Sequence, residues 1–452
     1  MTYSSLIFAS VILPVSVLFL FFDRSSEYKN LCLCITSLLF ITWGHNILAA
    51  LMFLTLIVDY LFALAVEGSM KRDKSRAVVF LLLDLVMNAA ILVFLGHSEL
   101  FSEESGLRLN EIYVPVGAAF YSIKNFSYVY DVFTGRCKAE RSPFYILTYG
   151  MSYPFLLAGP VVRYGDIAPQ LRDRKLTVGL MSSGIKSFAV GFVKTIVAVP
   201  VLKSIADAGL YAEGAAGAGS AVGMLAWLCM MWFAFTGMSD MGTGIARLNG
   251  FDVPLNYRRL TAKHMLGGVV KCYNTSLIEF AEDIRGEGAK SAVLTVVLAV
   301  CAAVFYSGNI VYIIVGLIAG IILAGEYLFA YDRIEEFPTP VKAVITFIAA
   351  YALFSPLAFD SFGDWTGWLT GLISPGGETS ANVLALLRKN VLILILCFVS
   401  MSPVGEMLKR SADKIAERSR GAYTAVRVTE AVLTAAALAV GYILLAANTA
   451  AV

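Results

Sequence analysis

The sequence predicts an all-α integral membrane protein that crosses the bilayer many times, and three observations support this. The chain of 452 residues is 58% hydrophobic and only 15% charged, with a mean hydropathy of +0.75. Soluble domains are typically about 45–50% apolar and about 25% charged. The apolar residues also recur in runs along the whole chain. We therefore expect one transmembrane domain over residues 1–452, with roughly 10–13 membrane-embedded helices, some of them re-entrant.

The expected spans follow the apolar runs, because a membrane-spanning helix needs about 20 mostly apolar residues. The first run lacks a basic leader and a small-residue cleavage site, so we interpret it as a retained span. The run at 143–160 is followed directly by a charged segment, and we expect it to be re-entrant. The runs lie near residues 5–22, 31–49, 48–66, 77–96, 113–134, 143–160, 178–205, 220–236, 291–306, 309–331, 341–357, 390–405 and 428–447.

Basic residues in the short loops predict the orientation, since such loops face the cytoplasm. Lys71–Arg76, Arg136–Arg141 and Lys409–Arg427 are basic and are expected on the cytoplasmic side. Glu99–Glu111 is acidic and is expected outside. Both chain ends then lie outside, provided that 143–160 does not cross the bilayer completely.

The cysteine and histidine content of the chain limits the kinds of site that it can form. Most of the seven cysteines lie in apolar runs and none forms a CxxC pair, so we expect small buried residues rather than disulfides or metal ligands. The chain has only three histidines, His45, His97 and His264. No basic groove or aromatic-basic motif is present, which argues against nucleic acid and leaves membrane lipid as the expected surroundings.

The stretch from Phe235 to Asp283 is the most polar part of the chain between long apolar segments. Ionisable groups at membrane depth usually mark a functional interior, and Asp240 closely follows an apolar run. A solvated loop is the alternative, favoured for Arg258–Lys263 because Pro254 and Asn256 interrupt regular structure.

Two phrases carry a resemblance to a known family. YPFLLAGPVVRYGDIAPQLRDR at 153–174 and FTGMSDMGTGIARLNGFDVPLNY at 235–257 resemble the membrane-bound O-acyltransferases, most closely the branch that O-acetylates alginate and other exported polysaccharides. The resemblance implies a multi-helix membrane fold at the plasma membrane. It implies transfer of an acyl group, expected to be acetyl, from a thioester donor such as acetyl-CoA, with no permanently bound cofactor. It also implies a partner, either an extracytoplasmic acyltransferase or a polysaccharide-export protein.

The resemblance breaks where the family carries its two active-site histidines. Asn274 stands at the first position and Ser307 at the second. Neither side chain accepts a proton at neutral pH, and loss of a general base typically costs about 10²–10⁴ in rate. His264, ten residues before Asn274, is a candidate substitute base, but a loop histidine without a catalytic role is the favoured interpretation.

Other candidates come from the matching phrases, and for each a structural role is the alternative. Arg163 and Tyr164 match the VRY phrase, where the guanidinium would bind oxyanions of a donor or anchor a cytoplasmic boundary. Ser239 and Asp240 match the SDM phrase, where the carboxylate would orient a pocket, pair with Arg163 or Arg247, or make an internal hydrogen bond.

Two hypotheses therefore remain open. The first is an O-acyltransferase that acts on a surface polysaccharide, with altered catalysis. The second is a degenerate homologue, a pseudoenzyme that conducts an acyl group or lipid, or acts as a scaffold in a surface-polymer complex. Asn274 and Ser307 favour the second for mechanism, whereas the family resemblance favours the first.

Overall fold

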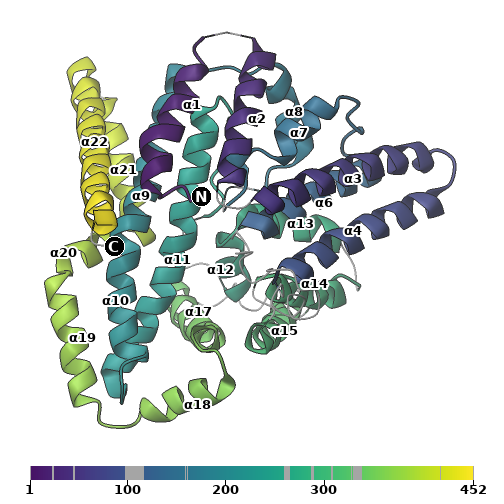
Figure 1. The fold of residues 1–452 in the computed structure, drawn as a ribbon. Helices are drawn as coiled ribbons and strands as arrows, with labels where there is room; N and C mark the ends of the chain where they lie inside the picture. Colours follow the sequence, from purple (N-terminus) through teal and green to yellow (C-terminus); the bar gives the residue numbers. More distant parts are fainter. Residues whose placement is uncertain are drawn as a thin grey trace. The chain divides into compact units, whose positions relative to one another are not determined.

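A computed structural model describes most of the chain, and the described part is helical (Figure 1). Between the described helices there is one isolated antiparallel bridge, Tyr257 to Tyr273, and no extended strand. The prediction of an all-α fold is confirmed. The described residues are 2–22, 25–43, 46–96, 117–157, 159, 161–258, 265–286, 290–306, 309–326, 328, 338–417 and 419–450.

The chain forms two compact units. The first contains Met1–Phe188 and Met238–Asn256, and the second contains Ala189–Gly237 and Tyr257–Val452. The divisions fall inside two helices, α9 (Val178–Val193) and α11 (Gly217–Leu248). The expectation of a single domain over residues 1–452 stays a prediction.

The first unit begins with the amino-terminal helices and ends on the carboxyl-terminal part of α11. Besides the first part of α9, its described elements are η1 (Phe8–Ile12), α1 (Leu13–Phe19), α2 (Ser26–Thr42), α3 (Asn46–Met70), α4 (Lys74–Gly96), α6 (Gly117–Thr134), α7 (Pro143–Gly150), η3 (Tyr153–Phe155) and α8 (Tyr164–Arg172).

The second unit contains the later helices together with the remaining parts of α9 and α11. Its other described elements are η4 (Lys194–Ala198), α10 (Val199–Leu210), α12 (Leu266–Cys272), α13 (Thr275–Arg285), α14 (Lys290–Tyr306), α15 (Ile310–Gly325), α17 (Thr339–Phe354), η6 (Ser355–Ala358), α18 (Phe362–Gly371), α19 (Gly377–Lys389), α20 (Val391–Met401), α21 (Pro403–Ala416) and α22 (Arg420–Ala450).

The described helices include several that can cross a membrane. Five continuous helices are long and apolar enough, and the bent pair α19 and α20 raises the number to six. Shorter apolar helices lie at Phe8–Phe19, Ser291–Val304 and Ile310–Gly325, and α4 and α6 coincide with two more of the expected spans. The prediction of a multi-pass membrane protein is confirmed. The five continuous helices are Ala50–Met70, Val178–Leu210, Gly217–Leu248, Thr339–Ala358 and Arg420–Ala447.

The segment expected to be re-entrant contains only short helices among its described residues. Helix α7 has 8 residues, which at about 1.5 Å per residue gives about 12 Å, against roughly 30 Å of hydrocarbon. It ends at Gly150, and the short 3₁₀ helix η3 follows it. Helix α8 then begins at Tyr164 with a mostly polar sequence. The described residues of 143–160 therefore form no helix long enough to span the bilayer, and the re-entrant course stays a prediction.

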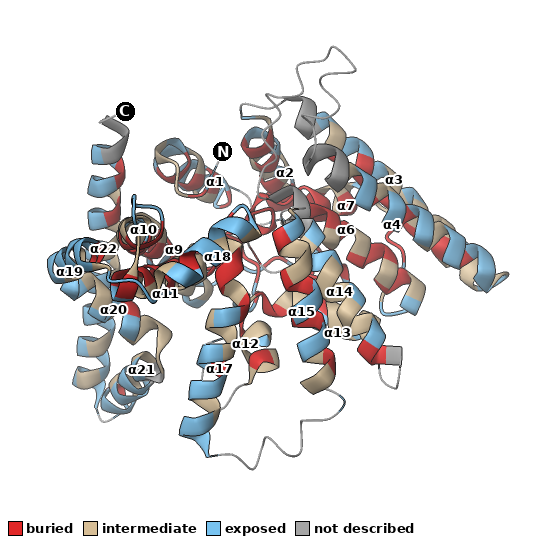
Figure 2. Ribbon diagram, turned by 90° about the horizontal axis from the view of Figure 1, so that it is seen from below, coloured by how far each residue is buried: buried red, intermediate tan, exposed pale blue. Residues whose placement is uncertain are grey.

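Helices α3, α4 and α6 pack side by side and enclose polar groups (Figure 1). Asp59 and Asp84 are fully buried between them, and the Asn88 amide donates to Asp59 Oδ1 at 3.0 Å and to the Asp84 carbonyl at 3.1 Å. Apolar side chains such as Leu54 and Leu82 are instead exposed, and Figure 2 shows pale exposed faces along α3 and α4. Exposed apolar and buried polar residues are the arrangement expected of helices in lipid.

The two family-like phrases meet in the first unit through glycines. A Cβ atom on Gly242 would lie 2.9 Å from the Pro154 carbonyl oxygen and 3.1 Å from Gly159 Cα. Both neighbours are backbone atoms, so no side chain can move aside to make room. The SDM phrase on α11 is therefore in backbone contact with the AGP phrase, and this contact requires glycine.

Candidate functional site

Arg163 immediately precedes helix α8 and is buried. Its guanidinium forms an ion pair with Asp131 near the end of α6, whose side chain is fully buried. Because a buried charge is costly unless it is paired, each group stabilises the other in the interior. The pair fixes the start of α8 relative to α6. Binding of donor oxyanions by Arg163 stays a prediction.

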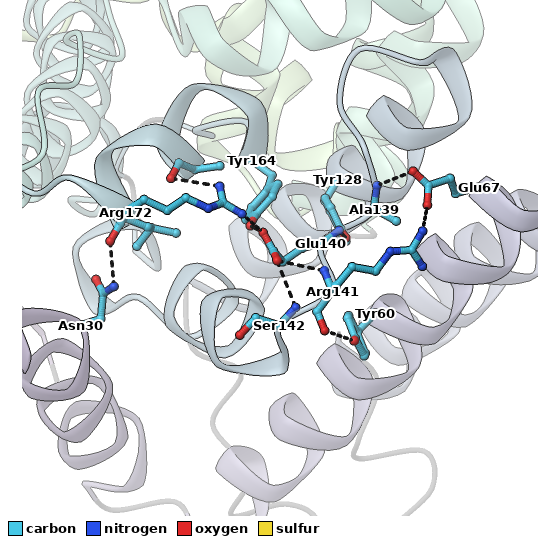
Figure 3. Close-up of polar contacts among 12 residues, drawn as sticks. Asn30, Tyr60, Glu67, Tyr128, Ala139, Glu140, Arg141, Ser142, Tyr164 and Arg172 are labelled. Carbon is cyan, nitrogen blue, oxygen red and sulfur yellow. Dashed lines mark hydrogen bonds and ion pairs between the residues drawn. The ribbon is translucent and has the colours of Figure 1, made fainter. Parts of the chain in front are cut away.

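Tyr164, the first residue of α8, is held by aromatic neighbours and by a carboxylate. Its ring contacts those of Tyr128 and Tyr149 edge-on, with centroids 5.0 and 5.2 Å away. Its hydroxyl donates to Glu140 Oε2 (Figure 3). Burial, together with the hydrogen bond to the carboxylate, raises the pKa of the Tyr164 phenol well above its usual range. Tyr164 therefore stays protonated and acts as a donor.

Glu140 is the centre of this polar cluster (Figure 3). Its Oε1 accepts from the backbone N–H groups of Arg141 and Ser142, at 2.9 and 3.0 Å, and its Oε2 accepts from Tyr164 and pairs with Arg172. Burial alone would raise the pKa of Glu140, but these donors outweigh it and hold the pKa below the ordinary value. The ionised carboxylate thereby ties the loop after α6 to helix α8.

A hollow of about 380 Å³ lies beside this cluster in the first unit. Basic side chains from the loop after α6 and from α8 line it together with Glu140. Arg141 also pairs with Glu67 of α3, while Arg136 and Lys138 are exposed. Arginine and lysine side chains around a hollow of this size can bind an anion, especially a phosphate. The basic residues of the lining are Arg136, Lys138, Arg141 and Arg172.

The same hollow contains a thiol that is unsuited to nucleophilic chemistry. Cys137 lines it, and burial together with the nearby Asp131 raises the pKa of the thiol to about 12. A thiolate is the reactive form of cysteine, so Cys137 is inert at neutral pH. The chemistry available to the hollow is therefore binding rather than covalent catalysis.

Of the predicted residues on α11, Ser239 and Asp240 lie in the interior of the first unit and Arg247 is half-buried. Ser239 is fully buried and Asp240 is 3% exposed. The Arg247 guanidinium donates to Ser187 Oγ at 3.3 Å and to the Val253 carbonyl at 3.0 Å. The expected burial of Asp240 is confirmed, whereas its role in a pocket stays a prediction.

Asn274 lies in the second unit, at the sharp break between α12 and α13. Its backbone has φ 56° and ψ 60°, the left-handed conformation, and it is the residue that caps α13. Apart from glycine, Asn, Asp and His are the residue types most often found in this conformation. Asn274 is 7% exposed. The turn explains why an asparagine is tolerated there, independently of any catalytic role.

His264 and Ser307 lie outside the described residues, as do His45 and His97 and the acidic segment Glu99–Glu111. Their predicted roles and sidedness stay predictions. Within the described ranges, no group of three or more His, Cys, Asp or Glu residues is placed to hold a metal ion.

Several polar contacts in the two units were not predicted from the sequence. Asp131 and Glu140 organise the start of α8 in the first unit. In the second unit, Lys194 Nζ donates to the Tyr257 hydroxyl at 3.0 Å. The one signal in the sequence for this contact was a lysine inside an apolar run, because charged residues are rare within membrane-spanning segments.

Comparison with known proteins shows similarity to polysaccharide O-acetyltransferases. The chain is 27% identical over 400 residues to the "Probable alginate O-acetylase AlgI" of Pseudomonas putida, which covers 81% of each chain. It is 26% identical over 370 residues to the protein of the same name in Pseudomonas aeruginosa, covering 77% of this chain and 70% of the relative. A peptidoglycan O-acetyltransferase of Helicobacter pylori is 21% identical over 293 residues, about half of each chain.

These similarities confirm the resemblance seen in the motifs, including the branch to which they point. No protein-family model matches the chain. The similarity extends over most of the chain rather than over one motif, so it includes both units.

Proposed function

We propose that the protein is a membrane O-acyltransferase that moves an acyl group, expected to be acetyl, onto an exported cell-surface polysaccharide. The similarity to alginate O-acetylases over about four fifths of the chain is the main support. The buried ion pair of Arg163 and the glycine contact of α11 show that the family-like phrases form a specific packed structure. The protein acts at the plasma membrane as a multi-pass component.

The donor in this proposal is a thioester such as acetyl-CoA, which carries phosphate groups. In the basic hollow beside Glu140, Arg136 and Lys138 would bind those phosphates, and both residues belong to a loop that is expected to be cytoplasmic. Its volume of about 380 Å³ lies within the range typical of ligand sites. An extracytoplasmic acyltransferase or a polysaccharide-export protein would receive the acyl group or present the acceptor.

One observation favours a second function. Asn274 stands where the family has a histidine, and its left-handed backbone gives it a structural reason to be there. A degenerate homologue that conducts acyl groups or lipids, or acts as a scaffold in a surface-polymer complex, would need no base at this position.

Transfer by the purified protein distinguishes the two functions. The protein is reconstituted in lipid vesicles with acetyl-CoA carrying a labelled acetyl group, and alginate is supplied as the acceptor. We expect labelled ester on the polymer above the level given by vesicles without protein. Correctly folded protein that transfers no label to alginate, to partly hydrolysed peptidoglycan or, when the vesicles are supplemented with a cell-envelope extract, to any protein or polymer in it would contradict the proposed activity and support the degenerate homologue.

The basic hollow has its own test in the same vesicles. The double variant Arg136→Gln with Lys138→Gln is expected to raise the KM for acetyl-CoA about tenfold or more, since two phosphate contacts are removed, and to leave kcat nearly unchanged. Lys203→Gln is a matched control, because Lys203 is an exposed lysine whose ion pair is with Asp207 in the second unit. An unchanged KM in the double variant would rule out the hollow as the donor's phosphate site.

A further inference from the structure

Lys194 and Tyr257 form a polar pair in the second unit that the family resemblance did not single out. Lys194 begins the π-helical turn η4 and is 7% exposed. Its Nζ donates to the Tyr257 hydroxyl at 3.0 Å and lies 4.7 Å from the centroid of the Tyr257 ring. A lysine in an apolar helix is expensive unless it has such partners.

The pair lies beside the turn that contains Asn274. Tyr257 forms the antiparallel bridge with Tyr273, the residue directly before Asn274. The bridge is reinforced next to it, where the backbone N–H of Arg258 donates to the Cys272 carbonyl at 2.9 Å. Tyr257 thus belongs to the bridged segment next to the turn where the family carries its histidine, and its hydroxyl accepts from the ammonium of Lys194 on η4.

Aromatic packing holds the two tyrosines in this arrangement. Trp232 of α11 contacts both rings, with centroid distances of 6.3 Å to Tyr257 and 6.0 Å to Tyr273. Phe235 packs on Tyr273 with centroids 4.3 Å apart. These contacts limit the freedom of the segment, and a positioned side chain is what acid–base catalysis requires.

We propose that Lys194 and Tyr257 form the acid–base pair that does the work of the missing histidine in acyl transfer. This inference rests on the proposed function and names the groups that perform its proton transfers. Tyr257 exchanges the proton with the reactants, and Lys194 is a positioning residue. The hydrogen bond from Lys194 fixes the position of the Tyr257 oxygen and supports negative charge on that oxygen during the transfer.

The reaction balances with the thioester donor and the polysaccharide hydroxyl alone. The phenolate oxygen of Tyr257 takes the proton of the acceptor hydroxyl. At the same time, the oxygen of the acceptor hydroxyl attacks the thioester carbonyl carbon. A carbon–oxygen bond forms, and the carbon–sulfur bond breaks with its electron pair on sulfur. The thiolate then takes the proton from Tyr257, which regenerates the phenolate and releases a free thiol and the ester. Lys194 keeps its proton throughout.

Other ionisable groups lie on the neighbouring elements, and two of the basic ones form ion pairs of their own. Arg258 pairs with Glu279 at 3.0 Å, and Lys271 pairs with Glu282 at 2.5 Å. Cys272 is buried next to Tyr273, and the helices that pack on η4 contribute Cys397 of α20 and Tyr442 of α22. Lys194 and Tyr257 differ from these groups because they bond to each other beside the Asn274 turn.

The first test uses conservative variants in the reconstituted transfer assay. Tyr257→Phe is expected to lower kcat about 10²–10⁴-fold, the usual loss for a general base, with little change in KM. Lys194→Met is expected to lower kcat similarly. Tyr442→Phe, which removes a half-buried tyrosine hydroxyl on α22, is the matched control and keeps wild-type turnover. Wild-type kcat in folded Tyr257→Phe would overturn the proposal.

A second measurement covers the case in which the variants fold poorly. Incorporating 3,5-difluorotyrosine at position 257 keeps the ring and hydroxyl but makes the phenol a stronger acid. The pH at which turnover rises should move to lower values by about the difference in acidity between the two phenols. An unmoved pH profile would show that Tyr257 is structural. Failure of the proposed function is separate, because then the wild-type protein itself transfers no label.

Discussion

Replacing Asn274 by alanine and, in parallel, by glycine separates the backbone role of this residue from any role of its amide. Both changes remove the amide. They differ in the left-handed backbone at φ 56°, which glycine adopts freely and alanine does not. The comparison therefore isolates the conformational cost at the turn between α12 and α13.

The structure sets the expected size of the difference. A left-handed conformation costs an L-residue about 1–2 kcal/mol, and glycine loses about 0.5–1 kcal/mol of that advantage through its more flexible unfolded chain. We expect the free energy of unfolding to be about 1 kcal/mol lower for Asn274→Ala than for Asn274→Gly. Titration with SDS in mixed micelles, followed by circular dichroism, measures this difference.

The acetyl-transfer activity of the two variants is the second measurement. Because Tyr257 rather than Asn274 handles the proton in this account, both variants should transfer acetyl groups in proportion to the folded protein. Equal stability of the two variants would refute the left-handed turn as the reason for asparagine. Loss of transfer in both variants, with the fold intact, would show that the amide itself takes part in the reaction.

Three further predictions concern the first unit. Glu140→Gln should lower the free energy of unfolding by about 1–3 kcal/mol at pH 7, because it weakens a buried charged cluster. Since the folded pKa of Glu140 lies below its ordinary value of 4.5, the carboxylate stabilises the fold above that pH and loses its effect as the pH falls through the folded pKa. The variant should therefore differ less from wild type at about pH 3 than at pH 7 in SDS titrations, and an equal difference at both pH values would contradict this. Gly242→Ala should lower the free energy of unfolding by about 1–3 kcal/mol, because the added Cβ forces backbone atoms apart. Gly68→Ala is the control, at an exposed helical glycine with open space where its Cβ would lie, and it should be neutral or stabilising. Equal effects of the two variants in thermal unfolding would argue against the α11 contact. Asp84→Asn should leave stability unchanged or raise it, because it removes one of two buried acids that face each other, and a loss above about 1 kcal/mol would show that both carboxyl groups are needed.

The sequence was sufficient to predict the class of fold, because lipid places a simple requirement on composition and length. Apolar runs near 48–66 and 220–236 correspond to α3 and part of α11. The charged segment after 160 led us to expect that 143–160 does not cross completely; α7 has only 8 residues, and whether the segment crosses stays a prediction. Local patterns of this kind are readable because each one is set by the residues within a single helix.

The contacts that shape the candidate sites were not readable in this way. Asp131 and Arg163 are 32 residues apart, and nothing in the sequence around either residue indicates the other partner. Lys194 and Tyr257 are 63 residues apart, and their hydrogen bond depends on the tertiary fold, in which Tyr257 is also bridged to Tyr273. The motifs located the region of Asn274, but its left-handed backbone depends on how α12 and α13 are joined.

The O-acetyl content of exported polysaccharide shows whether Tyr257, rather than Asn274, takes part in acyl transfer in the cell. Cells that lack the chromosomal copy of this protein are supplied with the wild type, Asn274→Ala or Tyr257→Phe, at matched levels in the membrane, and the ester is measured on the purified polymer. We expect the wild type and Asn274→Ala to restore the ester and Tyr257→Phe not to restore it. Full restoration by Tyr257→Phe, or none by the wild type, would contradict this expectation.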